Sequence, residues 1–190
     1  MNPTIPPFFI LGLPRSRTAW LANWLTTDRS LCLHDGTRGA RTLGEFYDRL
    51  RPTPARPWMG SSGGDLAWIA EPLAKQFPGA RWTVIEREAD ECVRSTLRAF
   101  PLALTPGQVE VMLSQLAFQL TRIEELTGEE PLRVSFGRLD DEDVARRLWG
   151  HCLPGVSFDA ARWRLLKTLN VQLDARFAPQ PKEAKCPGHG

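Results

Sequence analysis

Residues 8–20 read F-F-I-L-G-L-P-R-S-R-T-A-W, and this stretch decides which fold the chain can adopt. Phe8 to Leu11 form a short apolar run that ends at Gly12, which is typical of a buried strand. A helix is predicted from about Ser16 to about Thr27, because large apolar residues recur on one side of it: Trp20, Leu21, Trp24 and Leu25. A buried strand that passes through a tight turn into a helix is the first unit of an α/β fold.

Further strands and helices alternate downstream of this unit. Apolar segments predict strands at Leu31–Leu33, Trp82–Ile85 and Leu132–Phe136. Periodic patterns predict helices at Thr42–Leu50, Ala67–Phe77, Asp90–Phe100, residues 105–128, from Asp140 onward, and Ala160–Leu169. The alternation predicts an α/β fold with a mostly parallel central sheet that helices cover on both faces.

Two segments of this pattern carry strong local signals. Thr105-Pro-Gly-Gln108 is a capping box with proline at the first helical position, and it predicts the start of the long helix that Gly128 ends. Residues 51–64 contain three prolines and three glycines, which predict a loop with room for one short strand near Trp58 and Met59.

Length and composition limit the class of protein. The 190 residues include 24 lysines and arginines against 22 aspartates and glutamates, so the formal charge is only +2 and a nucleic-acid-binding protein is not expected. The hydrophobic content of 42% argues against a disordered chain. We expect one domain over residues 1–177 and a disordered tail over residues 178–190, which lack large apolar side chains. No apolar run approaches the roughly 20 residues that a membrane-spanning helix needs.

The cysteines and the first residues bear on the compartment. Cys32, Cys92, Cys152 and Cys186 are widely spaced and form no C-x-x-C pair, so no metal site is expected. Residues 1–12 lack a basic segment followed by a long apolar one, so they do not read as a secretory signal. We therefore expect a reduced, cytoplasmic protein.

The turn after the first strand has the composition of an anion-binding loop. Free backbone N–H groups at the start of a helix, including that of Ala19 here, attract phosphate or sulfate. Arg15 and Arg17 add positive charge, and Ser16 and Thr18 add hydroxyl donors. The G-x-x-x-x-G-K-[ST] pattern of ATPases does not fit, because Arg17 replaces its second glycine and Thr18 its lysine. The alternative is an ordinary strand–turn–helix with surface arginines.

The segment G-L-P-R-S-R-T-A-W resembles the 5′-phosphosulfate loop of the P-loop sulfotransferases, whose pattern is roughly G-x-P-[KR]-S-x-T-x-W/L. A second signature of that family is a strand that ends in arginine, followed eight residues later by a serine in a helix. Here W-T-V-I-E-R-E-A-D-E-C-V-R-S places Arg87 and Ser95 at that spacing. The resemblance covers about residues 6–100 and implies a three-layer sandwich of the P-loop NTPase-like kind.

The resemblance implies a reaction and roles for individual residues. Family members transfer a sulfuryl group from 3′-phosphoadenosine 5′-phosphosulfate (PAPS) to a hydroxyl or amine and release 3′-phosphoadenosine 5′-phosphate (PAP). Arg15 would stabilise charge on the leaving oxygen. The loop residues from Ser16 to Ala19 would hold the 5′-phosphosulfate, although many members have glycine where Arg17 stands. Arg87 and Ser95 would hold the 3′-phosphate.

The general base is expected beyond the end of the second strand. Asp35 falls near the glutamate base of some family members, and His34 is an equally suitable base with an ordinary pKa of about 6.5. Both residues can also be a plain turn at the end of a strand. Asp65 is a third candidate, with a helix N-cap as its alternative role. The acceptor is expected to be a small molecule or a peptide.

The resemblance weakens after residue 100. The segment L-R-V-S-F-G-R-L-D-D stands where the family often has a strand followed by Y-E-D-L, and Leu139 is the match. The late glycine-rich basic segment of many members is not recognisable, and the tail offers Lys182 and Lys185. Two alternatives therefore stay open, a P-loop kinase or other nucleotide-binding protein, and a non-catalytic relative.

Overall fold

The computed structural model describes residues 5–100 and 104–168. Within them the chain forms a five-stranded sheet in the order β2-β3-β1-β4-β5, and every neighbouring pair of strands is parallel. The predicted parallel α/β fold is therefore confirmed. The strands are β1 (Phe8–Gly12), β2 (Ser30–His34), β3 (Trp58–Ser62), β4 (Arg81–Glu86) and β5 (Leu132–Ser135).

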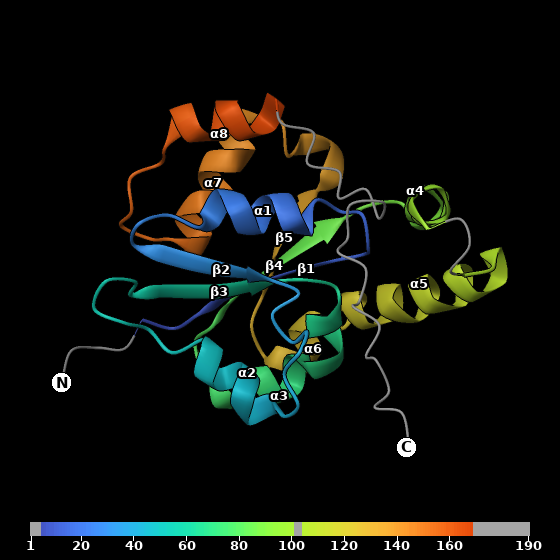
Figure 1. Cartoon of the computed structure of the whole chain (residues 1–190), viewed down its shortest axis with the longest axis horizontal. Helices are drawn as coiled ribbons and strands as arrows, with labels where there is room; N and C mark the ends of the chain where they lie inside the picture. The colour runs from blue at the N-terminus through green and yellow to red at the C-terminus, as the bar shows by residue number, and fades with distance from the viewer. Residues whose placement is uncertain (1–4, 101–103, 169–190) are drawn as a thin grey trace, which may run out of the picture.

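Helices cover both faces of the sheet, which makes three layers (Figure 1). One face carries α1 (Thr18–Leu25), α7 (Glu142–Cys152) and α8 (Ala160–Thr168). The other carries a 3₁₀ helix and five α-helices: η1 (Asp65–Ile69), α2 (Leu43–Arg49), α3 (Ala70–Gln76), α4 (Ala89–Ala99), α5 (Pro106–Thr121) and α6 (Ile123–Thr127). The short 3₁₀ helix η2 (Phe136–Arg138) follows β5.

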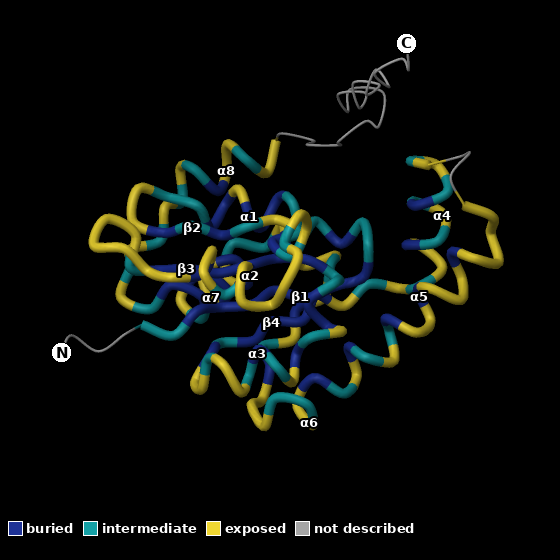
Figure 2. The backbone as a smooth tube through the Cα atoms, turned by 60° about the horizontal axis from the view of Figure 1, so that its bottom comes forward, coloured by how far each residue is buried: buried dark blue, intermediate teal, exposed yellow. Residues whose placement is uncertain are grey.

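The central strand β1 shows why both faces must be covered. Phe8 and Ile10 point into the core under α1 and α7, whereas Phe9 and Leu11 point into the core under α3 and α5. All four side chains are 0% exposed, and the strands form the dark, buried centre of Figure 2. Two-residue alternation of large apolar side chains on a strand fills both layers at once.

The first predicted helix begins later than expected. It was predicted from about Ser16, but α1 begins at Thr18 and ends at Leu25. Arg15 and Arg17 adopt positive φ angles of 71° and 60°, and the N–H of Ser16 donates to the carbonyl of Leu13. These three features keep the chain in a turn through Arg17, so the loop is longer than the sequence pattern indicated.

The short strand expected near Trp58 and Met59, within the loop predicted over residues 51–64, is present and is longer than expected. Residues Trp58–Ser62 form β3, which is buried throughout and pairs with both β1 and β2. The strand W-M-G-S-S lacks the β-branched residues that signal a strand. Gly60 belongs there because a Cβ would lie 2.4 Å from the ring of Phe8.

Two of the other predicted helices are each divided into two shorter ones. The expected helix over residues 105–128 is two, because Arg122 has φ −96° and ψ 6° and separates α5 from α6. Its capping box at Thr105 is confirmed, and Gly128 ends α6 in the left-handed region with φ 71°. The helix predicted over Ala67–Phe77 is η1 followed by α3. Leu169, at the end of the last predicted helix, and the predicted tail over residues 178–190 lie outside the described residues.

The order of the strands fixes where a ligand can bind. From β1 the chain continues through α1 to β2 on one side, and from β4 it continues to β5 on the other. Adjacent strands whose connections leave in opposite directions open a crevice at their carboxyl ends. Those ends carry Gly12 and Glu86, and they face the side on which α4 lies (Figure 1). Within the ranges described, no helix has the length and apolar character needed to cross a bilayer.

Candidate functional site

The loop between β1 and α1 exposes backbone donors at the carboxyl edge of the sheet. The first hydrogen bond of α1 runs from the N–H of Leu21 to the carbonyl of Arg17, over 2.9 Å. The N–H groups of Thr18, Ala19 and Trp20 are therefore the free donors of the first turn. No acidic side chain lies in that turn. The helix dipole and these donors together favour a bound anion.

Two arginines in this loop hold unfavourable backbone conformations. Non-glycine residues at positive φ cost about 1–2 kcal/mol each, and both Arg15 and Arg17 lie in that region. Residues at alternating backbone handedness turn successive N–H groups toward one concavity, which suits an anion. The geometry also explains why glycine is the easier residue at the position of Arg17.

The structure brings the two predicted motifs together. Arg15 Nε donates to Ser95 Oγ over 3.3 Å, and Arg87 Nη1 donates to the backbone carbonyl of Arg15. Arg87 also donates through Nε to Glu91 at 3.2 Å, and its side chain is only 14% exposed. The loop after β1 is thus joined to the end of β4 and to α4. Two guanidinium groups converge beside the free N–H groups of α1.

The hydroxyl of Ser16 faces the protein interior. The residue is 0% exposed, and its Oγ lies 3.9 Å from Cys92 Sγ on α4. Burial raises the pKa of the Cys92 thiol, while the contact with Ser16 and the nearby Arg87 oppose that rise. Ser16 therefore fixes the loop against α4 in this conformation. Its expected contact with an anion remains a prediction.

The residues expected to supply a base lie next to the start of α1. Thr18 Oγ1 and His34 Nε2 are 3.4 Å apart, and the same nitrogen lies 3.5 Å from Asp35 Oδ1. The side chains of His34 and Asp35 are 32% and 41% exposed, so solvent reaches both. Because one nitrogen meets both oxygens, the arrangement is not a relay like the Ser-His-Asp triad. His34 and Asp35 are groups that can accept or donate a proton, and they lie beside the loop between β1 and α1.

Asp65 lies close to this group from the opposite side of Gly63. Asp65 Oδ1 and Asp35 Oδ1 both lie within 3.0 Å of the place where a Gly63 Cβ would stand. Thr37 donates to Asp65 Oδ2, whereas Oδ1 is buried without a partner in the part of the chain that the structure describes. Burial raises the pKa of the Asp65 carboxyl, the Thr37 hydrogen bond opposes this, and the charge of Asp35 adds to the rise. Gly64, not Asp65, is the N-cap of η1.

Two residues at this edge, Asp140 and Phe136, were not predicted from the sequence. Asp140 pairs with Arg17 Nη1 at 2.8 Å, and Lys167 Nζ donates to the carbonyl of Asp140 over 2.7 Å. The Phe136 ring lies under the guanidinium groups of Arg17 and Arg87. The signal for both was present in the segment F-G-R-L-D-D, which directly follows the strand next to β4.

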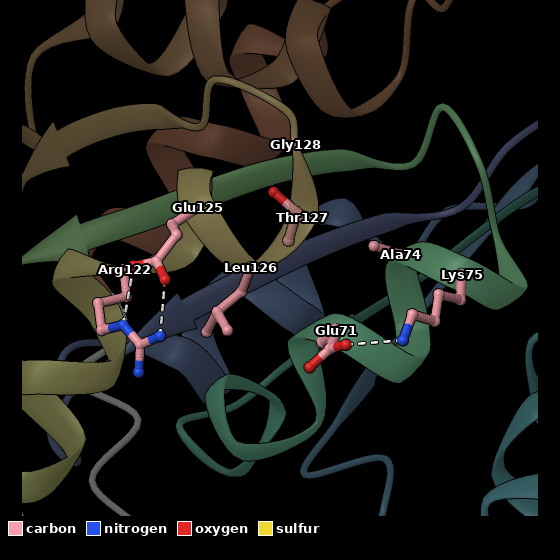
Figure 3. Close-up of a pocket in the computed structure, with 8 residues that line it drawn as sticks. All are labelled: Glu71, Ala74, Lys75, Arg122, Glu125, Leu126, Thr127 and Gly128. Atoms are coloured by element: carbon pink, nitrogen blue, oxygen red, sulfur yellow. Dashed lines mark hydrogen bonds and ion pairs between the residues drawn. The ribbon is translucent and has the colours of Figure 1, made fainter.

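A separate groove lies between α3 and α6 (Figure 3). Its charged groups form two internal pairs, Glu71 with Lys75 at 2.6 Å and Arg122 with Glu125 at 2.8 Å. Lys75 lowers the pKa of Glu71, and Arg122 lowers that of Glu125, through exposed hydrogen bonds. The two positive and two negative side chains cancel, so they give the groove no net charge that would attract an ionic ligand. The groove contains none of the residues that converge at the carboxyl edge.

Comparisons with other proteins add no family to this picture. A scan against protein-family models and a search of the curated proteins found no match to the chain. No group of three or more His, Cys, Asp or Glu side chains that could hold a metal ion occurs in residues 5–100 and 104–168. The assignment of function therefore depends on the geometry at the carboxyl edge.

Proposed function

We propose that the chain is a sulfotransferase of the P-loop NTPase-like kind, which transfers a sulfuryl group from PAPS to a hydroxyl or amine. The observation that carries the proposal is the contact of Arg15 with both Ser95 and Arg87. Two motifs that resemble the same family, separated by some seventy residues, meet at Arg15, whose guanidinium contacts Ser95 and whose backbone carbonyl accepts from Arg87. They meet at the carboxyl ends of β1 and β4, which is the place where sheets of this topology bind ligands.

The groups at this crevice match the chemistry of the donor. PAPS carries a 5′-phosphosulfate and a 3′-phosphate, and the loop and the Arg87–Ser95 pair offer adjoining sets of donors for these anions. Arginine suits both, because its planar fork can donate two parallel hydrogen bonds to one oxyanion. The free N–H groups at Thr18 and Ala19 add donors that need no further reorganisation.

In the proposed reaction, the S–O bond to the 5′-phosphate breaks as the acceptor oxygen or nitrogen bonds to sulfur. The leaving phosphate oxygen gains negative charge, which Arg15 and the loop N–H groups stabilise. The acceptor loses a proton, which His34 or Asp35 takes up. His34 lies against Thr18 at the start of α1, so the base stands beside the loop that holds the donor.

The free thiols of Cys32, Cys92 and Cys152 support a reducing compartment such as the cytoplasm for this enzyme. All three are buried. Burial, the chief cause, raises the pKa of the Cys152 thiol to about 12. Thiols of this kind are unreactive, so we assign them no part in the reaction.

The deciding experiment is thermal unfolding with PAP. At a hundred times its dissociation constant, PAP should stabilise the protein by about 2.7 kcal/mol, which raises the Tm by roughly 5–10 °C for a chain of this length. Arg15→Ala should abolish most of this shift. Stabilisation by ATP and magnesium but not by PAP would support a kinase instead and overturn the proposal.

A transfer assay separates an enzyme from a non-catalytic relative. With PAPS labelled in the sulfuryl group and a panel of phenols, alcohols and amines, the wild type should form labelled product. Asp35→Asn and His34→Ala should distinguish the two candidate bases, because the true base should lower turnover by about 10²–10⁴. Binding of PAP with no transfer to any acceptor in the panel would favour the non-catalytic relative.

A further inference from the structure

One aromatic ring holds the two arginines that come from different motifs. Phe136 is the first residue of η2, directly after β5, and its half-buried ring packs against the core under α1. The guanidinium carbon of Arg87 lies 4.0 Å from the ring centroid, and that of Arg17 lies 5.3 Å from it. Both distances fall within the range of a cation–π contact.

The geometry leaves hydrogen-bond donors on both guanidinium groups. A ring contacts the face of a guanidinium, whereas all five N–H donors lie along its edge. Within the described residues, Arg87 uses its edge for Glu91 and the carbonyl of Arg15, and Arg17 uses its edge for Asp140. The remaining donors stay available to an anion at the crevice.

Two positive groups at one ring repel each other unless negative charge lies close by. Asp140 and Glu91 supply part of that charge, at 2.8 Å from Arg17 and 3.2 Å from Arg87. Both carboxylates are on the surface, with side chains 44% and 48% exposed, so solvent screens them. Arg15 and Lys167 join the same group through Arg87 and Asp140, so four positive side chains meet two negative ones, and a ligand with two negative charges would complete the balance.

We propose that Phe136 is a positioning residue that fixes Arg17 and Arg87 as a clamp for a polyanionic group, such as two linked phosphoryl or sulfuryl groups. This inference deepens the proposed function and rests on it for the identity of the ligand. Phe136 does not touch the reacting atoms in this role. It acts by holding two guanidinium faces so that their edges point to one place.

The chain offers a matched control for this ring. Phe158 also lies under an arginine, since Arg146 is 4.5 Å from its centroid, and it belongs to the same core as Trp24 and Trp149. Phe136→Leu and Phe158→Leu therefore remove the same kind of contact, one at the crevice and one away from it. Phe136→Tyr keeps an aromatic face under both guanidinium groups.

The test measures binding of PAP and of inorganic pyrophosphate by calorimetry, together with the Tm of each variant. Phe136→Leu should weaken both ligands by about five- to thirtyfold, Phe136→Tyr should restore affinity to within about threefold, and Phe158→Leu should bind as the wild type does. Equal affinity of Phe136→Leu and the wild type, or failure of Phe136→Tyr to restore it, overturns the clamp. The clamp is also overturned if Phe136→Leu and Phe158→Leu lose the same affinity, since both losses would then come from disturbance of the hydrophobic core that the two rings share.

Pyrophosphate distinguishes failure of the clamp from failure of the proposed function. If the wild type binds pyrophosphate and Phe136→Leu does not, the clamp stands even where PAP fails to bind, and only the sulfotransferase assignment falls. If the wild type binds neither ligand, the clamp is overturned together with that assignment.

Discussion

Arg15 Nε donates a hydrogen bond to Ser95 Oγ over 3.3 Å, across 80 residues of sequence. The contact depends on α4 lying beside the loop after β1, and the buried Cys92 on the same helix holds it there against Ser16. The Arg15 side chain thus connects the loop after β1 with α4. Its guanidinium is held before any ligand arrives, which lowers the entropy lost on binding.

Replacing Ser95 should weaken the nucleotide without disturbing the fold. Ser95→Ala removes the acceptor of a hydrogen bond from the charged Arg15 guanidinium and one predicted donor to the 3′-phosphate, and loss of that donor should cost about 1–3 kcal/mol. We expect the Kd of PAP to rise about five- to a hundredfold, with a Tm close to that of the wild type. Ser114→Ala, at an exposed site on α5, is the control and should leave the Kd unchanged. Titration calorimetry checks both, and equal affinity of the two variants would contradict the role of Ser95.

The positive φ of Arg17 leads to a prediction about stability. Arg17→Gly and Arg17→Ala both remove the guanidinium and its pair with Asp140, so both should weaken PAP to a similar extent. Only glycine relieves the backbone, which has φ 60° here. Arg17→Gly should therefore be more stable than Arg17→Ala by about 1 kcal/mol, or about 2–4 °C in Tm. Differential scanning calorimetry measures this, and an alanine variant at least as stable would show that the loop carries no strain at this position.

Local patterns predict much of this fold. The apolar run at Phe8–Leu11, the capping box at Thr105 and the strand at Trp82–Ile85 each carry their signal within a few residues. The signal for β3 is weaker: the sequence allowed only a short strand near Trp58 and Met59, because W-M-G-S-S is buried through its neighbours β1 and β2. A parallel strand with small residues is defined by pairing over long sequence distances, which propensity does not encode.

The residues of the candidate site also differ in how far the sequence predicted them. Arg15, Arg87 and Ser95 were expected through the resemblance of two sequence segments to sulfotransferase motifs, and the fold brings the three residues together. Asp140 and Phe136 were missed, because they reach Arg17 only through the pairing of β5 with β4. The sequence did not indicate that the hydroxyl of Ser16 is buried against Cys92 on α4, because that contact depends on the packing of a helix about 76 residues away.

Asp65 should make stability depend on pH. Its folded pKa is raised, chiefly by burial, so its neutral form is favoured in the native state. The native protein has its full stability from this group below the unfolded pKa, and loses it as pH rises through the folded pKa. Asp65→Asn keeps an acceptor for Thr37 without the charge, so its Tm relative to the wild type should be higher at pH 7 than at pH 4. Thermal scans at both pH values check this.

The control for Asp65 is Asp28→Asn, because Asp28 is exposed in the turn before β2. The difference in Tm between Asp28→Asn and the wild type should vary less between pH 4 and pH 7 than the difference for Asp65→Asn. Asp35→Asn should reduce the pH dependence of Asp65 in part, because the charge of Asp35 contributes to the raised pKa. A difference between Asp65→Asn and the wild type that stays constant with pH would contradict the assignment.

Replacing Gly60 by alanine tests whether the sheet depends on the close approach of β3 to β1. A Cβ there would lie 2.4 Å from the Phe8 ring, whose side chain is fully buried and cannot move aside. Gly60→Ala should cost about 1–3 kcal/mol through overpacking, or a fall in Tm of about 2–12 °C. Gly150→Ala in α7 meets no atom within 4 Å and should instead stabilise the helix by up to about 1 kcal/mol. In the double variant Phe8→Leu with Gly60→Ala, the two losses should be less than additive, because the smaller side chain makes room. Full additivity in thermal or urea unfolding would mean that Gly60 is required for some reason other than the Phe8 ring.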